Sequence, residues 1–240
     1  MTASFPWYDL PSVRWANDLI WARMYPGAPA LDRRTPYEEQ WRSPELVISQ
    51  ACGLDLYVTS APIEPILAPI FDLPDCREGH YFSYLIGHPG NGTAAVNSLT
   101  SRSGCAALLR YSRPTALLLT GSHQASIRAV RDGDADFACI DAVIWHVLSR
   151  DAPELLKGVE IVERTDSATA PPYVVRANAE PDAGVRLSEA MTDPRLQSAR
   201  SALLLRGIKR VERDSYQDVF DEYERVRSRI PPVRRSATVA

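Results

Sequence analysis

The sequence lacks several features that would assign a chemistry directly. Its four cysteines, Cys52, Cys76, Cys105 and Cys139, form no CxxC pair and no spacing typical of a metal site. We therefore predict neither a bound metal nor a cofactor. No apolar stretch approaches the length of a membrane-spanning helix. Residues 1–6 lack the basic segment and apolar core of a secretion signal, which on its own favours the cytoplasm.

An excess of charge of one sign is also lacking. The 240 residues include 27 Lys and Arg and 30 Asp and Glu, a net charge of −3 at pH 7. This balance gives no reason to expect nucleic acid or an acidic membrane as a partner. A hydrophobic content of 45% and a charged content of 24% are typical of a globular protein. The length fits one large domain or two smaller lobes.

The cysteines leave two alternatives open. Cys105 lies near a predicted helix start, where the helix dipole can lower a thiol pKa and create a nucleophile. The other interpretation is a small buried thiol in a packed helix. Cys52 and Cys76 can pair if the protein meets an oxidising compartment, and otherwise they stay reduced.

The most informative stretch is a hydroxyl-rich turn that follows a predicted buried strand and opens a predicted helix. Ser101 or Ser103 can cap this helix, and Gly104 lets a ligand approach its first backbone N–H groups. These N–H groups and the helix dipole favour an anion. A hydroxyl followed by glycine also opens many ordinary helices, so the turn alone leaves both interpretations open.

The middle of the chain alternates strands and helices. The pattern predicts strand 93–96, helix 103–111, strand 116–120, helix 123–131, strand 135–140 and helix 141–148. This alternation indicates a parallel sheet with helices on its faces, and hence an α/β protein. An earlier strand, 45–50, ends at Gln50.

Polar residues follow three of these strands, where the carboxyl ends of parallel strands form one ligand-binding edge. Ser101 and Ser103 follow the first, His123 and Ser126 the second, and Asp141 the third. Each is also an ordinary helix-start residue. A Ser-His-Asp hydrolase is compatible with these residue types, but no glycine-flanked nucleophile elbow is present.

Seven segments then occur in a fixed order: Phe5–Pro11, Ser49–Gly53, Tyr81–Ser83, Asn97 with Ser101–Gly104, Gly121–Ser126, Gly133–Asp141 and Pro172-Tyr173. Together they resemble the phosphate/phosphonate family of ABC-transporter substrate-binding proteins, which have the type 2 periplasmic-binding-protein fold. The resemblance covers most of residues 5–175.

The resemblance implies two α/β lobes joined by two crossings, which close on a small oxyanion by hinge motion. We expect lobe 1 to comprise residues 1–90 and 177–240, and lobe 2 to comprise residues 91–176. The basic segment 231–240 lacks apolar periodicity and is expected to be a mobile tail.

The resemblance also implies a ligand site in the cleft between the lobes, with Gln50 and Tyr81 on lobe 1. The expected ligand-binding residues are Tyr8, Gln50, Tyr81, Ser101, Ser103, Gly104, His123, Ser126, Asp141 and Tyr173. No residue is assigned a catalytic role.

The expected function is binding of phosphate, a phosphonate or a phosphate ester for an ABC-type uptake system. The implied partner is an ABC permease and the implied location is the periplasm. Two alternatives stay open. One is an enzyme on the same scaffold that uses His123 and Asp141, with Cys105 as a further candidate. The other is a cytoplasmic ligand sensor.

Overall fold

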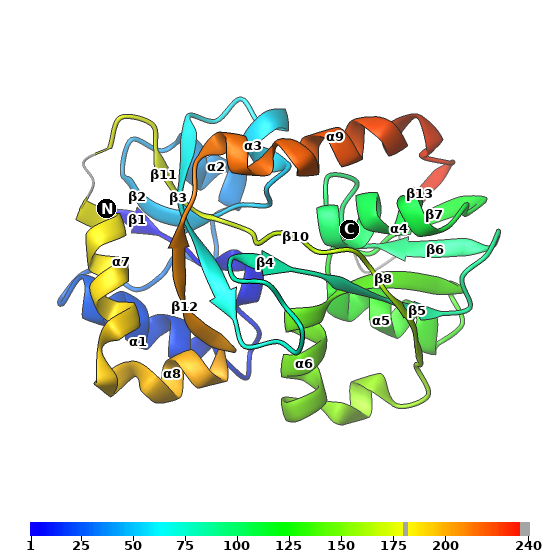
Figure 1. Ribbon diagram of the computed structural model, residues 1–240, viewed down its shortest axis with the longest axis horizontal. Helices are drawn as coiled ribbons and strands as arrows, with labels where there is room; N and C mark the ends of the chain where they lie inside the picture. The colour runs from blue at the N-terminus through cyan, green and yellow to red at the C-terminus, as the bar shows by residue number, and fades with distance from the viewer. Residues whose placement is uncertain (180–181, 236–240) are drawn as a thin grey trace. The chain divides into compact units, whose positions relative to one another are not determined.

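The computed structural model describes residues 1–179 and 182–235, and the chain divides into two compact units. Unit 1 comprises Met1–His80 and Thr169–Gln217, and unit 2 comprises Tyr81–Ala168 and Asp218–Ala240. The first two passages between units fall in the short paired strands β4 (His80–Tyr81) and β10 (Ala168–Thr169), which Figure 1 labels.

Unit 1 is built on a five-stranded mixed sheet in the order β1-β2-β11-β3-β12. Strands β1 and β2 are parallel, whereas β11 is antiparallel to β2 and β3, and β12 is antiparallel to β3. The strands are β1 (Thr2–Ala3), β2 (Leu46–Gln50), β3 (Ile63–Phe71), β11 (Tyr173–Arg176) and β12 (Leu205–Arg210). The predicted strand 45–50 is thereby confirmed as β2.

The helices of unit 1 bury apolar faces beside this sheet. Ala16, Ile20 and Met24 of α1 are almost completely buried, and α1 packs on α7 and α8, as Figure 1 shows. The α-helices are α1 (Arg14–Met24), α2 (Tyr37–Arg42), α3 (Asp55–Val58), α7 (Asp182–Thr192) and α8 (Gln197–Ala202). Short 3-10 turns are η1 (Pro6–Tyr8), η4 (Pro194–Leu196) and η5 (Arg213–Tyr216).

Unit 2 is built on a six-stranded sheet in the order β13-β7-β6-β8-β5-β9. Strands β13, β7, β6 and β8 run parallel to one another, and β5 is antiparallel to β8 and β9. The strands are β5 (Ser83–Gly87), β6 (Thr93–Val96), β7 (Ala116–Leu119), β8 (Phe137–Asp141), β9 (Ile161–Arg164) and β13 (Val233–Arg235). The predicted parallel arrangement of β6, β7 and β8 is confirmed.

The helices of unit 2 flank this sheet and close a core that includes Leu108, Leu117 and Phe137. The α-helices are α4 (Ala107–Tyr111), α5 (His123–Arg131), α6 (Ala142–Asp151) and α9 (Gln217–Val226). A π-helical turn, η2 (Arg102–Ala106), precedes α4, and the 3-10 turns are η3 (Pro153–Leu156) and η6 (Arg227–Arg229).

The C-terminal segment differs from the predicted lobe 1 range of 177–240. From Asp218 onward it groups with unit 2, because Val226 of α9 lies in the unit 2 core and Glu222 pairs with Arg102. The chain therefore makes a third passage, at 217–218. Strand β13 pairs with β7, so the mobile tail predicted for 231–240 is wrong for Val233–Arg235. Residues 180–181 and 236–240 of the predicted ranges lie outside the described residues.

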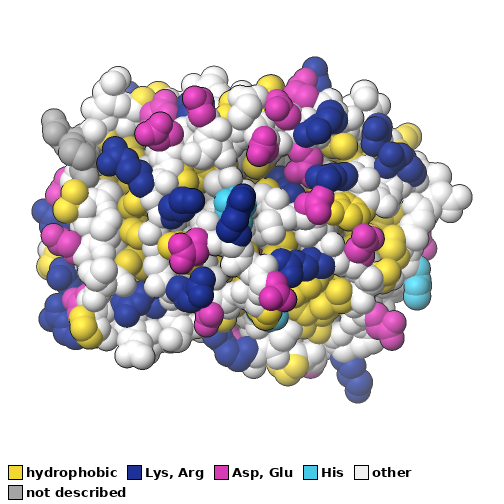
Figure 2. Space-filling view, in the orientation of Figure 1, with side chains coloured by type: hydrophobic (Ala, Val, Ile, Leu, Met, Phe, Trp, Pro, Cys, Tyr) yellow, Lys and Arg dark blue, Asp and Glu magenta, His cyan; other side chains and the backbone are white. Residues whose placement is uncertain are grey.

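Among the described residues, none of the helices is long and apolar enough to cross a membrane. On the face shown in Figure 2, basic and acidic side chains are interspersed rather than gathered into a patch of one sign. This distribution agrees with the small net charge of the chain.

Candidate functional site

The hydroxyl-rich turn after β6 is a capped helix start. Ser101 has an extended backbone, and its Oγ accepts a hydrogen bond from the backbone N–H of Gly104 at 3.0 Å. The N–H groups of Cys105 and Ala106 both donate to the carbonyl of Ser101, which makes the first turn π-helical. The backbone N–H groups of Arg102 and Ser103 have no partner within the described residues. Such free N–H groups at a helix start suit an anion.

Gly104 is required at this turn because another side chain occupies the space beside it. A Cβ at this position would collide with Oδ1 of Asn97 and lie 3.2 Å from Oγ of Ser101. The same Asn97 oxygen is buried and accepts no hydrogen bond from the described residues. The glycine therefore allows a close approach between the turn and Asn97.

A buried arginine lies inside the same turn. Arg102 is 2% exposed, and its Nε donates to Oε2 of Glu222 on α9 at 2.9 Å. Its Nη2 donates to the carbonyl of Asp166, and its guanidinium lies 5.6 Å from the Tyr81 ring centroid. Sequence reasoning missed Arg102 as a structural element of the site. Its position between Ser101 and Ser103 was the only signal, since Glu222 lies 120 residues away.

His123, the first residue of α5, joins this network from the end of β7. Its Nε2 lies 3.0 Å from Oγ of Ser103, and Oγ of Ser103 lies 3.4 Å from Oγ of Ser101. Burial lowers the pKa of His123 to about 4, so the imidazole is neutral at pH 7. The helix cap itself is Ser122, whose Oγ accepts from the N–H of Ala125. The structure thus brings Ser101, Ser103, Gly104 and His123 together.

Three further predicted residues belong to unit 2. Asp141 ends β8 and accepts the N–H of Val143 at 2.8 Å, which makes it the N-cap of α6. Ser126 is buried and its Oγ lies 2.7 Å from Oγ1 of Thr120. Tyr81 was expected on lobe 1, but it groups with unit 2, where its ring faces Arg102. Because β6, β7 and β8 are parallel, Ser101, His123 and Asp141 follow strand ends at the same sheet edge.

The remaining predicted residues, Tyr8, Gln50 and Tyr173, belong to unit 1. Gln50 ends β2 opposite Tyr173 of β11, and its Oε1 accepts the backbone N–H of Trp7 at 3.2 Å. Burial raises the pKa of Tyr173 well above its usual range, while the hydrogen bond with Gln50 acts in the opposite direction. Tyr8 is buried and packs edge-on against Phe71.

Neither a disulfide nor a nucleophilic Cys105 is supported by the structure. No disulfide joins Cys52 and Cys76, or any other two of the four cysteines. Burial raises the pKa of Cys105 to about 12, which disfavours the thiolate needed by a nucleophile. Cys105 therefore fits the interpretation of a buried thiol in a packed helix. Among the described residues, no cluster of three or more His, Cys, Asp or Glu side chains is arranged to hold a metal ion.

Comparison with known proteins gives one family. Residues 110–219 match the family model described as ABC transporter, phosphonate, periplasmic substrate-binding protein. A search of curated proteins found no match to the chain.

Solved structures share the fold over almost the whole chain. A binding-protein component of an ABC phosphonate transporter from Pseudomonas aeruginosa superposes with a TM-score of 0.74 at 12% identity, over 95% of this chain and 87% of that one. PhnD1 from Prochlorococcus marinus, in complex with methylphosphonate, gives 0.69 at 12% identity, over 95% and 98%. XAC2383 from Xanthomonas citri, bound to ATP, gives 0.63 at 16% identity, over 95% and 98%.

At 12–16% identity the structural likeness establishes the fold alone. The match to the family model adds a resemblance in sequence over residues 110–219. Both agree with the expectation drawn from the ordered motifs. The predicted resemblance is confirmed: the chain has the type 2 periplasmic-binding-protein fold and matches the phosphonate ABC-transporter substrate-binding family over residues 110–219.

Proposed function

We propose that this chain binds a small oxyanion, a phosphonate, phosphate or phosphate ester, as the substrate-binding component of an ABC-type uptake system. The observation that carries the proposal is the donor set at the start of η2. Free N–H groups of Arg102 and Ser103, the hydroxyls of Ser101 and Ser103, and the imidazole of His123 surround one turn. None of these groups carries a net charge, and an oxyanion accepts from the free N–H groups and the hydroxyls, while Nε2 of His123 stays hydrogen-bonded to Ser103.

The ion pair of Arg102 supports recognition by hydrogen bonds rather than by free charge. Its guanidinium is already neutralised by Glu222, so the turn keeps a fixed geometry while its neighbours act as donors. Fixed donors in a dehydrated site bind anions more strongly than donors in water. Methylphosphonate in the structure of PhnD1 supports the same ligand class.

The partner and the location follow from the same family. We infer that an ABC permease receives the ligand and that the protein acts in the periplasm, as the matched family model describes. Tyr8, Tyr81, Gln50, Gly104, Ser126, Asp141 and Tyr173 remain our proposed contributors alongside Ser101, Ser103 and His123.

Calorimetric titration with methylphosphonate, phosphate and sulfate tests this proposal. Ser103→Leu should abolish binding because it removes a hydroxyl and covers the free N–H groups, and Ser103→Ala should weaken it about tenfold. Ser112→Ala is the matched control, since that hydroxyl donates to the Leu108 carbonyl at the other end of the helix. Saturable binding that is the same in wild type and Ser103→Leu would contradict the proposal.

A further inference from the structure

The side chain of Arg102 contacts three segments of unit 2 that each adjoin a passage between the units. Its guanidinium lies 5.6 Å from the ring centroid of Tyr81, the residue at which the first passage enters unit 2. Its Nη2 donates to the carbonyl of Asp166 at 3.1 Å, just before the second passage in β10. Its Nε donates to Oε2 of Glu222 at 2.9 Å on α9, the helix in which the third passage falls. We call residues 81–84, 165–168 and 218–223 the passage segments.

The main chain of Arg102 belongs to the hydroxyl-rich turn. Its backbone N–H and that of Ser103 have no partner within the described residues, and both lie at the start of η2. The guanidinium of the same residue is buried in a close-packed interior, so a shift of the backbone also shifts the contacts of the side chain. Arg102 thus combines an N–H group offered to an anion with contacts to all three passage segments.

Neighbouring side chains join the passage segments to one another. Nη2 of Arg110 donates to Oδ2 of Asp166, and Nη1 of Arg110 lies 3.8 Å from Oε1 of Glu222. Nη1 of Arg102 and Oε1 of Glu222 are buried and make no hydrogen bond with the described residues. Because unsatisfied buried atoms are costly, the network gains free energy from a rearrangement that gives them partners. The pair of Arg102 with Glu222 is therefore able to respond to a movement of the turn.

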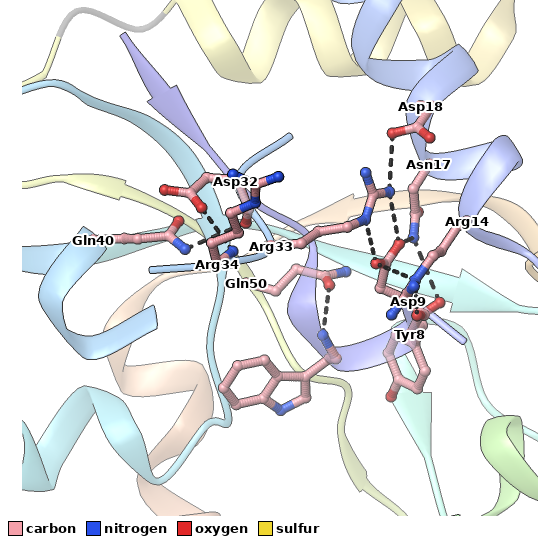
Figure 3. A network of polar contacts seen from close by, with 11 residues as sticks. Tyr8, Asp9, Arg14, Asn17, Asp18, Asp32, Arg33, Arg34, Gln40 and Gln50 are labelled. Carbon is pink, nitrogen blue, oxygen red and sulfur yellow. Dashed lines mark hydrogen bonds and ion pairs between the residues drawn. The ribbon is translucent and has the colours of Figure 1, made fainter. Parts of the chain in front are cut away.

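The polar network of unit 1 in Figure 3 is local by comparison. Asp9 accepts hydrogen bonds from Arg14, Asn17 and Arg33. These residues all precede the first passage, and the network joins neighbouring segments at the start of the chain. The network of Arg102 instead joins the anion-binding turn to segments that are far apart in the sequence.

We propose that Arg102 and Glu222 are positioning residues that couple the anion-binding turn to the passage segments. An anion on the N–H groups of the turn fixes the backbone at Arg102, and the buried guanidinium then restrains the segments that it contacts. Such a coupling is reciprocal, so loosening the passage segments weakens anion binding. The inference rests on the proposed oxyanion function, and it adds how occupancy of the turn reaches the passages.

Hydrogen exchange with and without saturating methylphosphonate or phosphate tests the coupling. In the wild type, the anion should slow exchange at residues 102–106 and also in all three passage segments. Glu222→Gln keeps the shape of the side chain but removes the charge. It should bind the anion about tenfold more weakly. The anion should still protect residues 102–106 in this variant but no longer protect the passage segments. Glu224→Gln, the same substitution at an exposed pair of α9, should match the wild type.

A second variant tests one contact of the network. Arg102→Lys keeps a cation beside Glu222, but a single ammonium lacks the planar fork that also reaches the carbonyl of Asp166. With the anion bound, residues 218–223 should therefore stay protected while 165–168 lose protection. This variant decides the matter if Glu222→Gln does not fold, because equal protection of 165–168 in Arg102→Lys and wild type would overturn the coupling.

The remaining outcomes separate the two proposals. Saturable binding in the wild type without protection of the passage segments would overturn the coupling and leave the oxyanion function intact. Equal protection of these segments in wild type and Glu222→Gln would do the same. If neither methylphosphonate nor phosphate binds the wild type saturably, the oxyanion proposal is refuted and the coupling with it.

Discussion

The two units differ in the burial and pairing of their arginines. In unit 2, Arg102 is buried and paired with Glu222, so the groups left for a ligand are hydroxyls, N–H groups and a neutral imidazole. In unit 1, Arg33 shares Asp9 at the surface and Arg34 has no ion-pair partner among the described residues. The first arrangement leaves uncharged hydrogen-bonding groups of fixed geometry, and the second places charged side chains in exposed or half-buried contacts. Added salt should therefore weaken the Arg33–Asp9 pair of unit 1 more than the buried Arg102–Glu222 pair of unit 2.

Breaking the buried pair should have the largest effect. Glu222→Ala leaves the Arg102 cation buried without its carboxylate, so we expect a loss of about 3–5 kcal/mol in the free energy of unfolding. Denaturant titration of the variant measures it. Glu224→Ala on the same helix is the control, because the pair of Glu224 with Arg227 is exposed and contributes about 1 kcal/mol or less. Equal losses of unfolding free energy in the two variants would mean that burial does not increase the contribution of the Arg102–Glu222 pair to stability.

The second-largest loss of stability should come from adding a methyl group at Gly104 in the hydroxyl-rich turn. In Gly104→Ala the new Cβ collides with Asn97, so the turn must shift, at a cost of about 1–3 kcal/mol, and methylphosphonate affinity should fall. Denaturant titration and calorimetry measure the two changes. Gly184→Ala in α7 is the control, since its Cβ would make an ordinary 3.5 Å contact with Ile66 of β3. An unchanged affinity in Gly104→Ala would show that the turn does not hold the anion.

The carboxylate of Asp141 should act on selectivity rather than on stability. An ionised carboxylate only accepts hydrogen bonds, so it favours a ligand with a proton over sulfate. Asp141→Asn can still cap α6, and it should lower the preference for methylphosphonate over sulfate by about tenfold. Parallel titrations of both anions at one pH measure that ratio. If the ratio stays the same, Asp141 is only a helix cap.

The local sequence pattern predicted the part of the site that lies at the ends of β6, β7 and β8. The alternation of short apolar runs with helices located β6, β7 and β8, and their parallel order brought the residues after them to one edge. Ser103 and His123, 20 residues apart, meet for this reason. The motifs in their order also indicated the family, because each reflects a turn or strand end with its own geometry.

Long-range packing could not be predicted in the same way. The pairing of Arg102 with Glu222 joins residues 120 apart, and nothing in the local sequence of α9 shows which unit it packs on. The lobe boundary and the assignment of Tyr81 were misplaced for this reason. The short strand β13 was missed because Val233–Arg235 is exposed and carries no apolar alternation. The buried Oε1 of Gln40, which has no hydrogen-bond partner among the described residues, could not be predicted either, because its burial depends on how separate segments pack.

The most direct test of the oxyanion site is the titration of His123 by NMR, with and without methylphosphonate. Its folded pKa lies below the ordinary value of 6.5, so the neutral imidazole stabilises the fold above pH 6.5, and this contribution is lost as the pH falls toward 4. A bound anion beside Ser103 favours the imidazolium. We therefore predict that saturating methylphosphonate raises the pKa of His123, while the pKa values of His80 and His146 stay the same. A His123 titration curve that stays the same when methylphosphonate binds would contradict the account.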